Sequence, residues 1–137
     1  LKKNKEFNNW DNVEVFNYAI ADKDGEMKLN LNTNNRTCHS LTLNYQQEGE
    51  MVKTRRIDTF LEENKIKKVD FMKFDVEGAE DMILRGTGFQ KAVSKIDALE
   101  VEFHLPNWQE LAKYLMELGY EARQYESSAI IVLFTKK

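Results

Sequence analysis

Residues 69–80 read VDFMKFDVEGAE, and this short run indicates the architecture of the chain. Its first half, residues 69–74, is largely apolar and lacks clean alternation, which is typical of a strand buried on both faces. Its second half begins a helix that we expect over residues 78–85 and that Gly86 is placed to end. A buried strand followed by a helix is the repeating unit of an α/β fold.

The sequence on either side extends this alternation over a single domain, residues 1–137. We expect further strands at residues 13–20, 26–31, 51–57, 96–103, 120–125 and 129–134, and a long, partly mobile polar loop over residues 32–50. Asp58 is expected to cap a short helix over residues 59–64, and Asn107 with Glu110 a capping box before the next helix. That helix is expected to bury Trp108, Leu111, Ala112, Leu115, Met116 and Leu118.

The last two strands are joined by only a few residues, which allows an antiparallel hairpin and forbids a parallel crossover. The predicted fold is therefore an α/β sheet that is mainly parallel, with an antiparallel hairpin at its edge.

Composition excludes several classes of protein. The 137 residues carry a formal net charge of -3, with acidic and basic residues interspersed, so we expect no nucleic-acid partner. No apolar run approaches the ~20 residues of a membrane span, and we expect no membrane partner. The single cysteine, Cys38, cannot form an internal disulfide, so a cytoplasmic setting is the default.

Four blocks of the sequence resemble the FkbM family of methyltransferases, in order and in spacing. The first is residues 69–80, which resemble the family's vDfiKiDvEGaE block. The others are AIADKDG at residues 19–25, RIDTFL at 56–61 and LEVEFH at 99–104. The resemblance implies a Rossmann-like methyltransferase sheet with a reversed strand at one edge. It also implies S-adenosylmethionine as the cofactor and, as the acceptor, a hydroxyl of a sugar (glycan) or another small molecule.

One family feature has no counterpart in these 137 residues. Family members carry, ahead of all four blocks, a strand with a Gly-rich turn that cradles the cofactor, and an acidic residue that holds its ribose. The nearest approach is RGTG at residues 85–88, which follows a helix instead of a strand. We therefore expect a C-terminal part of such a domain, with its N-terminal strands missing, that binds the cofactor weakly or not at all on its own.

Candidate catalytic residues gather at the ends of two predicted neighbouring strands, where open α/β sheets bind their ligands. Lys73 and Asp75 share one face of their strand by the period of two, and Glu100, Glu102 and His104 share a face of theirs. Transfer of a methyl group to a hydroxyl needs a base for the proton. We predict Asp75 as the group that positions or deprotonates the acceptor, His104 as the other candidate base, and Lys73 as their counter-charge. Glu77 and Glu102 are predicted to bind the acceptor.

On the cofactor side, the resemblance places Ala19, Ile20 and Asp22 beside the adenine. Asp22 has an alternative reading, because Asp-Lys-Asp-Gly forms a turn without any ligand. The loop that contains Arg36, Cys38, His39 and Ser40 could cover the acceptor.

Two rival functions stay open at this stage. Asp75, Glu77, Glu102 and His104 are ligand types that a divalent metal accepts, as in a metal-dependent hydrolase, although no tight spacing supports a metal site. Alternatively, the chain is a non-catalytic interaction module. In that case the bare edge of the strand at residues 69–74 would pair with another chain, giving a homo-oligomer.

Overall fold

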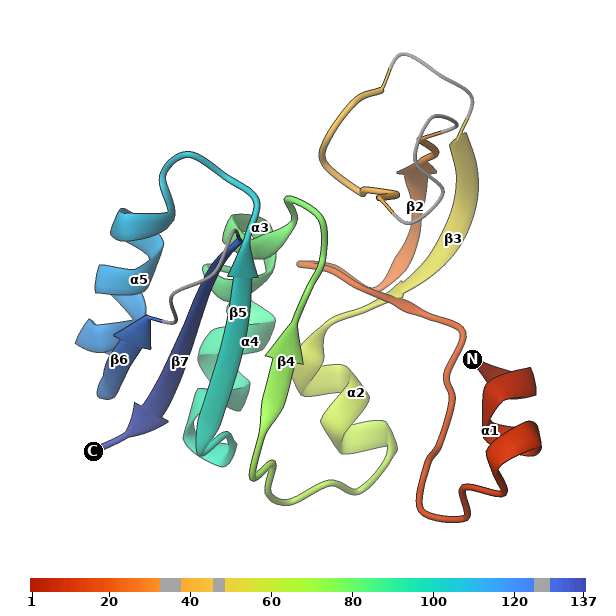
Figure 1. The fold of residues 1–137 in the computed structure, drawn as a ribbon, viewed down its shortest axis with the longest axis horizontal. Helices are drawn as coiled ribbons and strands as arrows, with labels where there is room; N and C mark the ends of the chain where they lie inside the picture. Colours follow the sequence, from red (N-terminus) through yellow and green to blue (C-terminus); the bar gives the residue numbers. More distant parts are fainter. Residues whose placement is uncertain (33–37, 46–48, 125–128) are drawn as a thin grey trace.

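The computed structural model describes residues 1–32, 38–45, 49–124 and 129–137 as a mixed α/β structure with two sheets (Figure 1). The helices are α1 (Lys2–Asn8), α2 (Ile57–Glu63), α3 (Glu80–Leu84), α4 (Thr87–Ala92) and α5 (Trp108–Glu117), with a 3-10 turn at Val93–Lys95. The strands are β1 (Ala19–Ile20), β2 (Gly25–Asn30), β3 (Gly49–Arg55), β4 (Met72–Phe74), β5 (Ala98–Phe103), β6 (Tyr120–Gln124) and β7 (Ile130–Lys136).

The strands of the described residues form a small sheet and a larger one. The small sheet has the order β1-β3-β2, with β1 parallel and β2 antiparallel to β3. The larger sheet has the order β4-β5-β7-β6, in which β4 pairs parallel with β5 while β7 pairs antiparallel with both β5 and β6. The predicted hairpin of the last two strands is confirmed, and β6 forms one edge of the sheet.

The predicted mainly parallel sheet is not confirmed, because both sheets are mixed. The reversed strand, β7, lies inside the larger sheet between β5 and β6 instead of at its edge. The physical reason is that β5 pairs with β7, so that two of the three pairings in this sheet are antiparallel.

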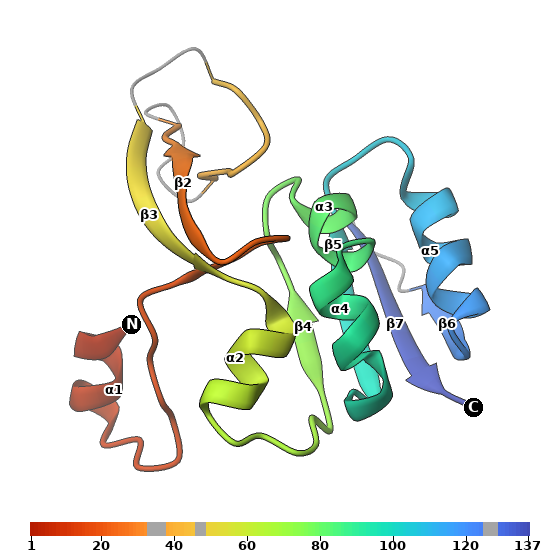
Figure 2. The ribbon, with the colours of Figure 1, turned by 180° about the vertical axis from the view of Figure 1, so that it is seen from behind.

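The hydrophobic core lies on one face of the larger sheet. Strand β5 alternates as predicted: Leu99, Val101 and Phe103 are buried, while Glu100 and Glu102 point to the other face and are half-buried. Side chains of α3, α4 and α5 join the first three in one cluster, and α3 and α4 are seen in front of β5 in Figure 2. Period-two burial in β5 therefore separates an apolar face from a face with carboxylates.

Two predicted strands are much shorter in the structure. Of residues 13–20, only Ala19 and Ile20 form β1, and of residues 69–74 only Met72–Phe74 form β4. Strand β4 is not buried on both faces as predicted: Lys73 is exposed, as is Phe71 beside it (53%). The reason is that Lys73 lies on the face of the sheet that carries Glu100 and Glu102, opposite the core; β4 also pairs only with β5 among the described strands.

The helices differ from prediction mainly at their ends. Asp58 does not cap α2; it lies inside the helix, and its carboxylate accepts a hydrogen bond from the Arg56 guanidinium instead. Asn107 does occupy the N-cap of α5, but no capping hydrogen bond from its side chain forms. Met116 is 49% exposed and not in the core.

Two helices were not predicted. The helix predicted at 78–85 is α3, which starts two residues later, at Glu80, and ends at Leu84. Gly86, expected only to stop that helix, is also the N-cap of the unpredicted α4, and the unpredicted α1 carries no apolar stripe that would mark it in the sequence. A long, partly mobile loop is expected over residues 32–50, but residues 33–37 and 46–48 of it lie outside the described residues. The loop ends where β3 begins, at Gly49, which is two residues earlier than predicted. In the described parts of the chain, no helix has the length and apolarity needed to cross a membrane.

Candidate functional site

The turn that follows β4 holds the backbone in an unusual conformation. Glu77 has a φ of 50° and Gly78 a φ of 91°, both in the left-handed region that favours glycine. A non-glycine residue held there costs of order 1–3 kcal/mol and persists where its surroundings impose it, often at functional sites. The strained backbone of this turn therefore sets the directions of the Asp75 and Glu77 side chains.

The surroundings that impose this conformation come from residues 40–43, in the segment that follows β2. Ser40 pairs with Asn30 at the end of β2, and its hydroxyl donates to the backbone carbonyl of Glu77. The Thr42 hydroxyl donates to the carbonyl of Gly78 over 2.7 Å. We call Ser40, Thr42 and Leu43 the clamp, because Leu43 also packs directly against Gly78.

Alanine at Gly78 tests the clamp. A Cβ there would lie 2.8 Å from Leu43 Cγ, in addition to the strain of the positive φ. We expect Gly78→Ala to lower the free energy of unfolding by about 2 kcal/mol in urea denaturation. The matched control is Gly119→Ala, at a φ of 97° with open space around the added Cβ, which should cost only about 1 kcal/mol. Equal losses would show that the clamp does not hold the turn.

Lys73 lies among three carboxylates, as the sequence predicts. Its Nζ is 3.9 Å from Asp75 Oδ2, 3.7 Å from Glu100 Oε1 and 3.9 Å from Glu102 Oε2. These distances are longer than hydrogen bonds, so Lys73 acts on the three groups through charge. The parallel pairing of Lys73 with Glu100 in the β4–β5 ladder produces this arrangement.

His104, directly after β5, connects this group to the turn. Its Nε2 is 3.6 Å from Glu77 Oε2 and 3.9 Å from Glu102 Oε1. Its Nδ1 is 2.9 Å from Oε1 of Glu80, whose side chain is completely buried. The same Oε1 accepts a hydrogen bond from the Gly78 N–H, and Oε2 has no partner among the described residues.

The pKa of His104 is raised above its ordinary 6.5. Burial alone would lower this pKa, but the hydrogen bond and charge of Glu80 outweigh it, with smaller contributions from Glu77 and Glu102. The imidazole is therefore shifted toward its cationic form, in which both ring nitrogens donate hydrogen bonds and neither is free to accept a proton.

A cavity of about 390 Å³ lies beside the turn and brings together residues from both predicted groups. Ala19 and Ile20, predicted for the cofactor, line it together with Asp75 and Glu77, predicted for the acceptor. Asp22 is not among its lining residues and lies beside Gly86 instead. His39 also lines the cavity, whereas Arg36 lies outside the described residues.

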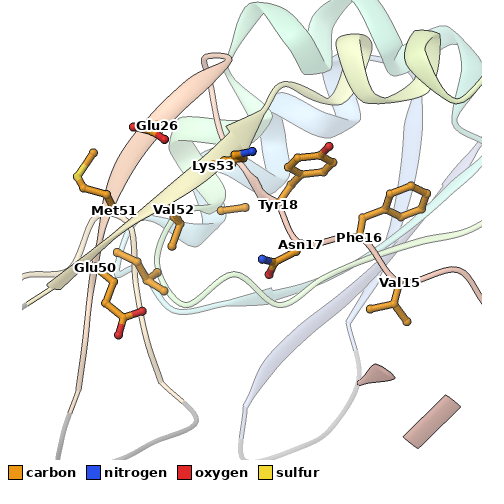
Figure 3. A pocket seen from close by; sticks show the side chains of 11 residues that line it. Val15, Phe16, Asn17, Tyr18, Glu26, Glu50, Met51, Val52 and Lys53 are labelled. Atoms are coloured by element: carbon orange, nitrogen blue, oxygen red, sulfur yellow. The ribbon is translucent and has the colours of Figure 1, made fainter. Parts of the chain in front are cut away.

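Two larger hollows lie elsewhere. One of about 750 Å³ is lined by residues 15–19 and by parts of β2 and β3, with Glu26, Glu50 and Lys53 at its border (Figure 3). Another of about 520 Å³ is a largely apolar groove along β4, between Phe16 and Phe71. Neither contains the turn residues Asp75 and Glu77, so size alone does not identify the site, and His104 is among the lining residues of none of the three hollows.

Sequence reasoning gave no role to Glu80, although the sequence carries a signal for it. Glu80, Ile83 and Leu84 have the i, i+3, i+4 spacing of one helix face, and all three are buried. A carboxylate on the apolar face of a helix needs a partner, and the structure supplies His104. The partner itself is 24 residues away in the chain and has no local signature.

These observations define an α/β protein with a small, largely apolar cavity that has two carboxylates at its border, at the carboxyl end of a parallel strand pair. The model of the methyltransferase FkbM domain matches residues 2–122, and the chain therefore belongs to the FkbM methyltransferase family. Comparison with curated proteins and with solved structures returned no match.

Proposed function

We propose that the chain takes part in S-adenosylmethionine-dependent methylation of a hydroxyl on a sugar or another small molecule. Membership of the FkbM methyltransferase family supports the reaction class. The structural observation that carries the proposal is the 390 Å³ cavity, which has an apolar wall at Ile20 and Val76 and an acidic border at Asp75 and Glu77.

The chemistry of the cavity fits part of the cofactor. Its volume is within the ~300–1,000 Å³ of small-molecule sites, and its apolar side chains suit an adenine ring. Asp75 and Glu77 suit the positive charge of a sulfonium. Its described lining includes no Lys or Arg for the carboxylate at the other end of the cofactor, so binding by these residues alone would be weak.

When bound, the cofactor supplies the methyl group. Asp75 is the better base of the two candidates, because its side chain is 43% exposed and lines the cavity, while His104 is shifted toward its cationic form. His104 would then donate a hydrogen bond or hold the charge of Glu77, and Lys73 would balance the remaining carboxylates. Glu102, 3.9 Å from His104, would contact the acceptor from the neighbouring strand.

The test is transfer of a labelled methyl group from S-adenosylmethionine to a panel of sugars and small alcohols, followed by alkaline treatment. A methyl ether survives alkali and a methyl ester does not, so the product identifies the accepting group. Asp75→Asn is expected to reduce kcat about 100-fold or more, because a positioned base contributes that much. Asp70→Asn is the matched control, since Asp70 is 85% exposed at the other end of the same segment. Full turnover by Asp75→Asn would remove Asp75 as the base, and an alkali-labile product would remove the hydroxyl acceptor.

The open edge of β4 favours a second candidate, an interaction module that pairs with a second copy of the chain. An unpaired strand edge is a template for another strand. Lys73 at the centre of β4 argues against it, because a lysine on an edge strand opposes such pairing. A monomer mass at all concentrations in light scattering would remove this candidate.

A further inference from the structure

Three side chains at the site have the arrangement of metal ligands. Asp75, Glu77 and His104 each offer one ligand atom, and these atoms all lie within 4.8 Å of one another. His104 Nε2 and Glu77 Oε2, 3.6 Å apart, are too distant for a hydrogen bond. Two ligand atoms about 2.1 Å from one tetrahedral ion are separated by roughly 3.4 Å, so small side-chain rotations would suffice.

A second observation comes from Glu80, behind the His104 ring. Its side chain is completely buried, its Oε1 lies 2.9 Å from Nδ1 of His104, and its Oε2 has no partner among the described residues. Histidines that bind metals generally donate the other ring N–H to a carboxylate, a backbone carbonyl or water, which fixes the tautomer and the ring orientation. Glu80 therefore holds His104 with Nε2 directed to Glu77.

The burial of Glu80 also needs a physical explanation. A carboxylate without solvent is costly unless its partner carries positive charge. A metal ion on Nε2 would polarise the Nδ1–H of His104 and so stabilise the carboxylate of Glu80. Among the described residues, Oε1 of the buried Glu80 has hydrogen-bond partners and Oε2 has none.

The surrounding charges favour a cation. Five carboxylates lie around two basic groups, Lys73 and His104; they are those of Asp75, Glu77, Glu80, Glu100 and Glu102. The basic groups therefore do not neutralise the site, even with His104 protonated. Lys73 is 3.9 Å from Asp75, near enough to compete with an ion for that ligand.

We propose that Asp75, Glu77 and His104 bind one divalent metal ion, with Glu80 as the residue that orients His104. One imidazole and two carboxylates suit Mn²⁺ or Zn²⁺, because imidazole favours the transition metals and carboxylates accept harder ions such as Mn²⁺. The proposal rests on this geometry and not on methyl transfer. In this proposal Asp75 is a metal ligand, whereas in the proposed function it is the base.

The test uses the purified chain, freed of metal with a chelator and dialysed. Titration with Mn²⁺, followed by the electron paramagnetic resonance signal of the free ion, is expected to give one site per chain. In a ¹⁵N spectrum, bound Mn²⁺ should broaden the amide signals of residues 75–78 and 103–105 first. No cofactor or acceptor is required, so failure here and failure of the proposed function are distinguishable.

Variants locate the ion. Asp75→Asn and His104→Gln are expected to weaken Mn²⁺ binding at least 10-fold, and Glu80→Gln by about 10- to 100-fold through its effect on His104. Asp70→Asn, at an exposed carboxylate outside the site, should leave the affinity unchanged. The Asp75 side chain is 43% exposed, so Asp75→Asn is expected to stay folded even if the other variants unfold, and circular dichroism checks this. No binding at millimolar Mn²⁺, or binding that Asp75→Asn leaves unchanged, would overturn the proposal.

Discussion

Replacement of His104 by alanine is expected to lower the free energy of unfolding by about 3 kcal/mol. The variant leaves the carboxylate of Glu80 completely buried without its basic partner, 2.9 Å away in the native chain. Removal of one member of a buried charged pair typically costs about 3–5 kcal/mol, because the other charge stays desolvated. We take the lower end because His104 itself is 23% exposed. Urea denaturation in the presence of a chelator measures the loss.

A double-mutant cycle separates this effect from lost packing. Glu80→Gln in the His104→Ala background removes the stranded charge and should recover part of the stability, so that the two losses are not additive. Additive losses would show that His104 and Glu80 contribute independently.

The loss should also depend on pH in a defined direction. Because the pKa of His104 is raised in the folded state, its stabilising effect is complete below the unfolded value of 6.5. That effect is lost as the pH rises through the folded pKa. The cost of His104→Ala should therefore be larger at about pH 6 than at about pH 9, and a cost that rises with pH would contradict the raised pKa.

Replacement of Phe89 by alanine is expected to cost about 4 kcal/mol, the largest effect on stability that we predict. Phe89 is 1% exposed on α4 and meets Phe74 of β4 edge to face, with ring centroids 6.3 Å apart. A buried phenylalanine truncated to alanine loses its transfer free energy and leaves a cavity, which together cost about 3–5 kcal/mol. Thermal unfolding should show a midpoint lowered by several degrees for each kcal/mol.

Phe7 provides the matched control for that experiment. It lies on α1 and is 87% exposed, so Phe7→Ala should change the free energy of unfolding by less than about 0.5 kcal/mol. A loss at Phe7 comparable to that at Phe89 would mean that α1 packs against the rest of the chain in solution.

The sequence predicts those parts of the fold in which local patterns decide the structure. Strand β5 alternates apolar and acidic residues, and its burial follows that alternation residue by residue. The pairing of β6 with β7 follows from the short connection between them. The position of β7 inside the sheet depends on pairing with β5, a contact between distant segments that local patterns do not encode.

The same division applies to the candidate site. The sequence identifies Lys73, Asp75 and Glu102 as neighbours because strand periodicity and parallel pairing bring them together. It misses the pair of Glu80 and His104, because a helix face and a strand end meet there only through tertiary packing. The expectation that β4 is buried on both faces is wrong, since an apolar strand has the same sequence pattern at an edge as in the centre of a sheet.

The clamp has a consequence for how the site responds to mutation and to local opening. Ser40 and Thr42, in the segment that follows β2, hold the backbone of Glu77 and Gly78 by hydrogen bonds. Partial unfolding of the β2–β3 hairpin would therefore release the strained turn while the larger sheet stays folded. The geometry of the proposed site therefore depends on a segment that carries none of the residues proposed to react. Random mutagenesis scored for function should find sensitive positions in this segment that a stability screen of the core would pass over.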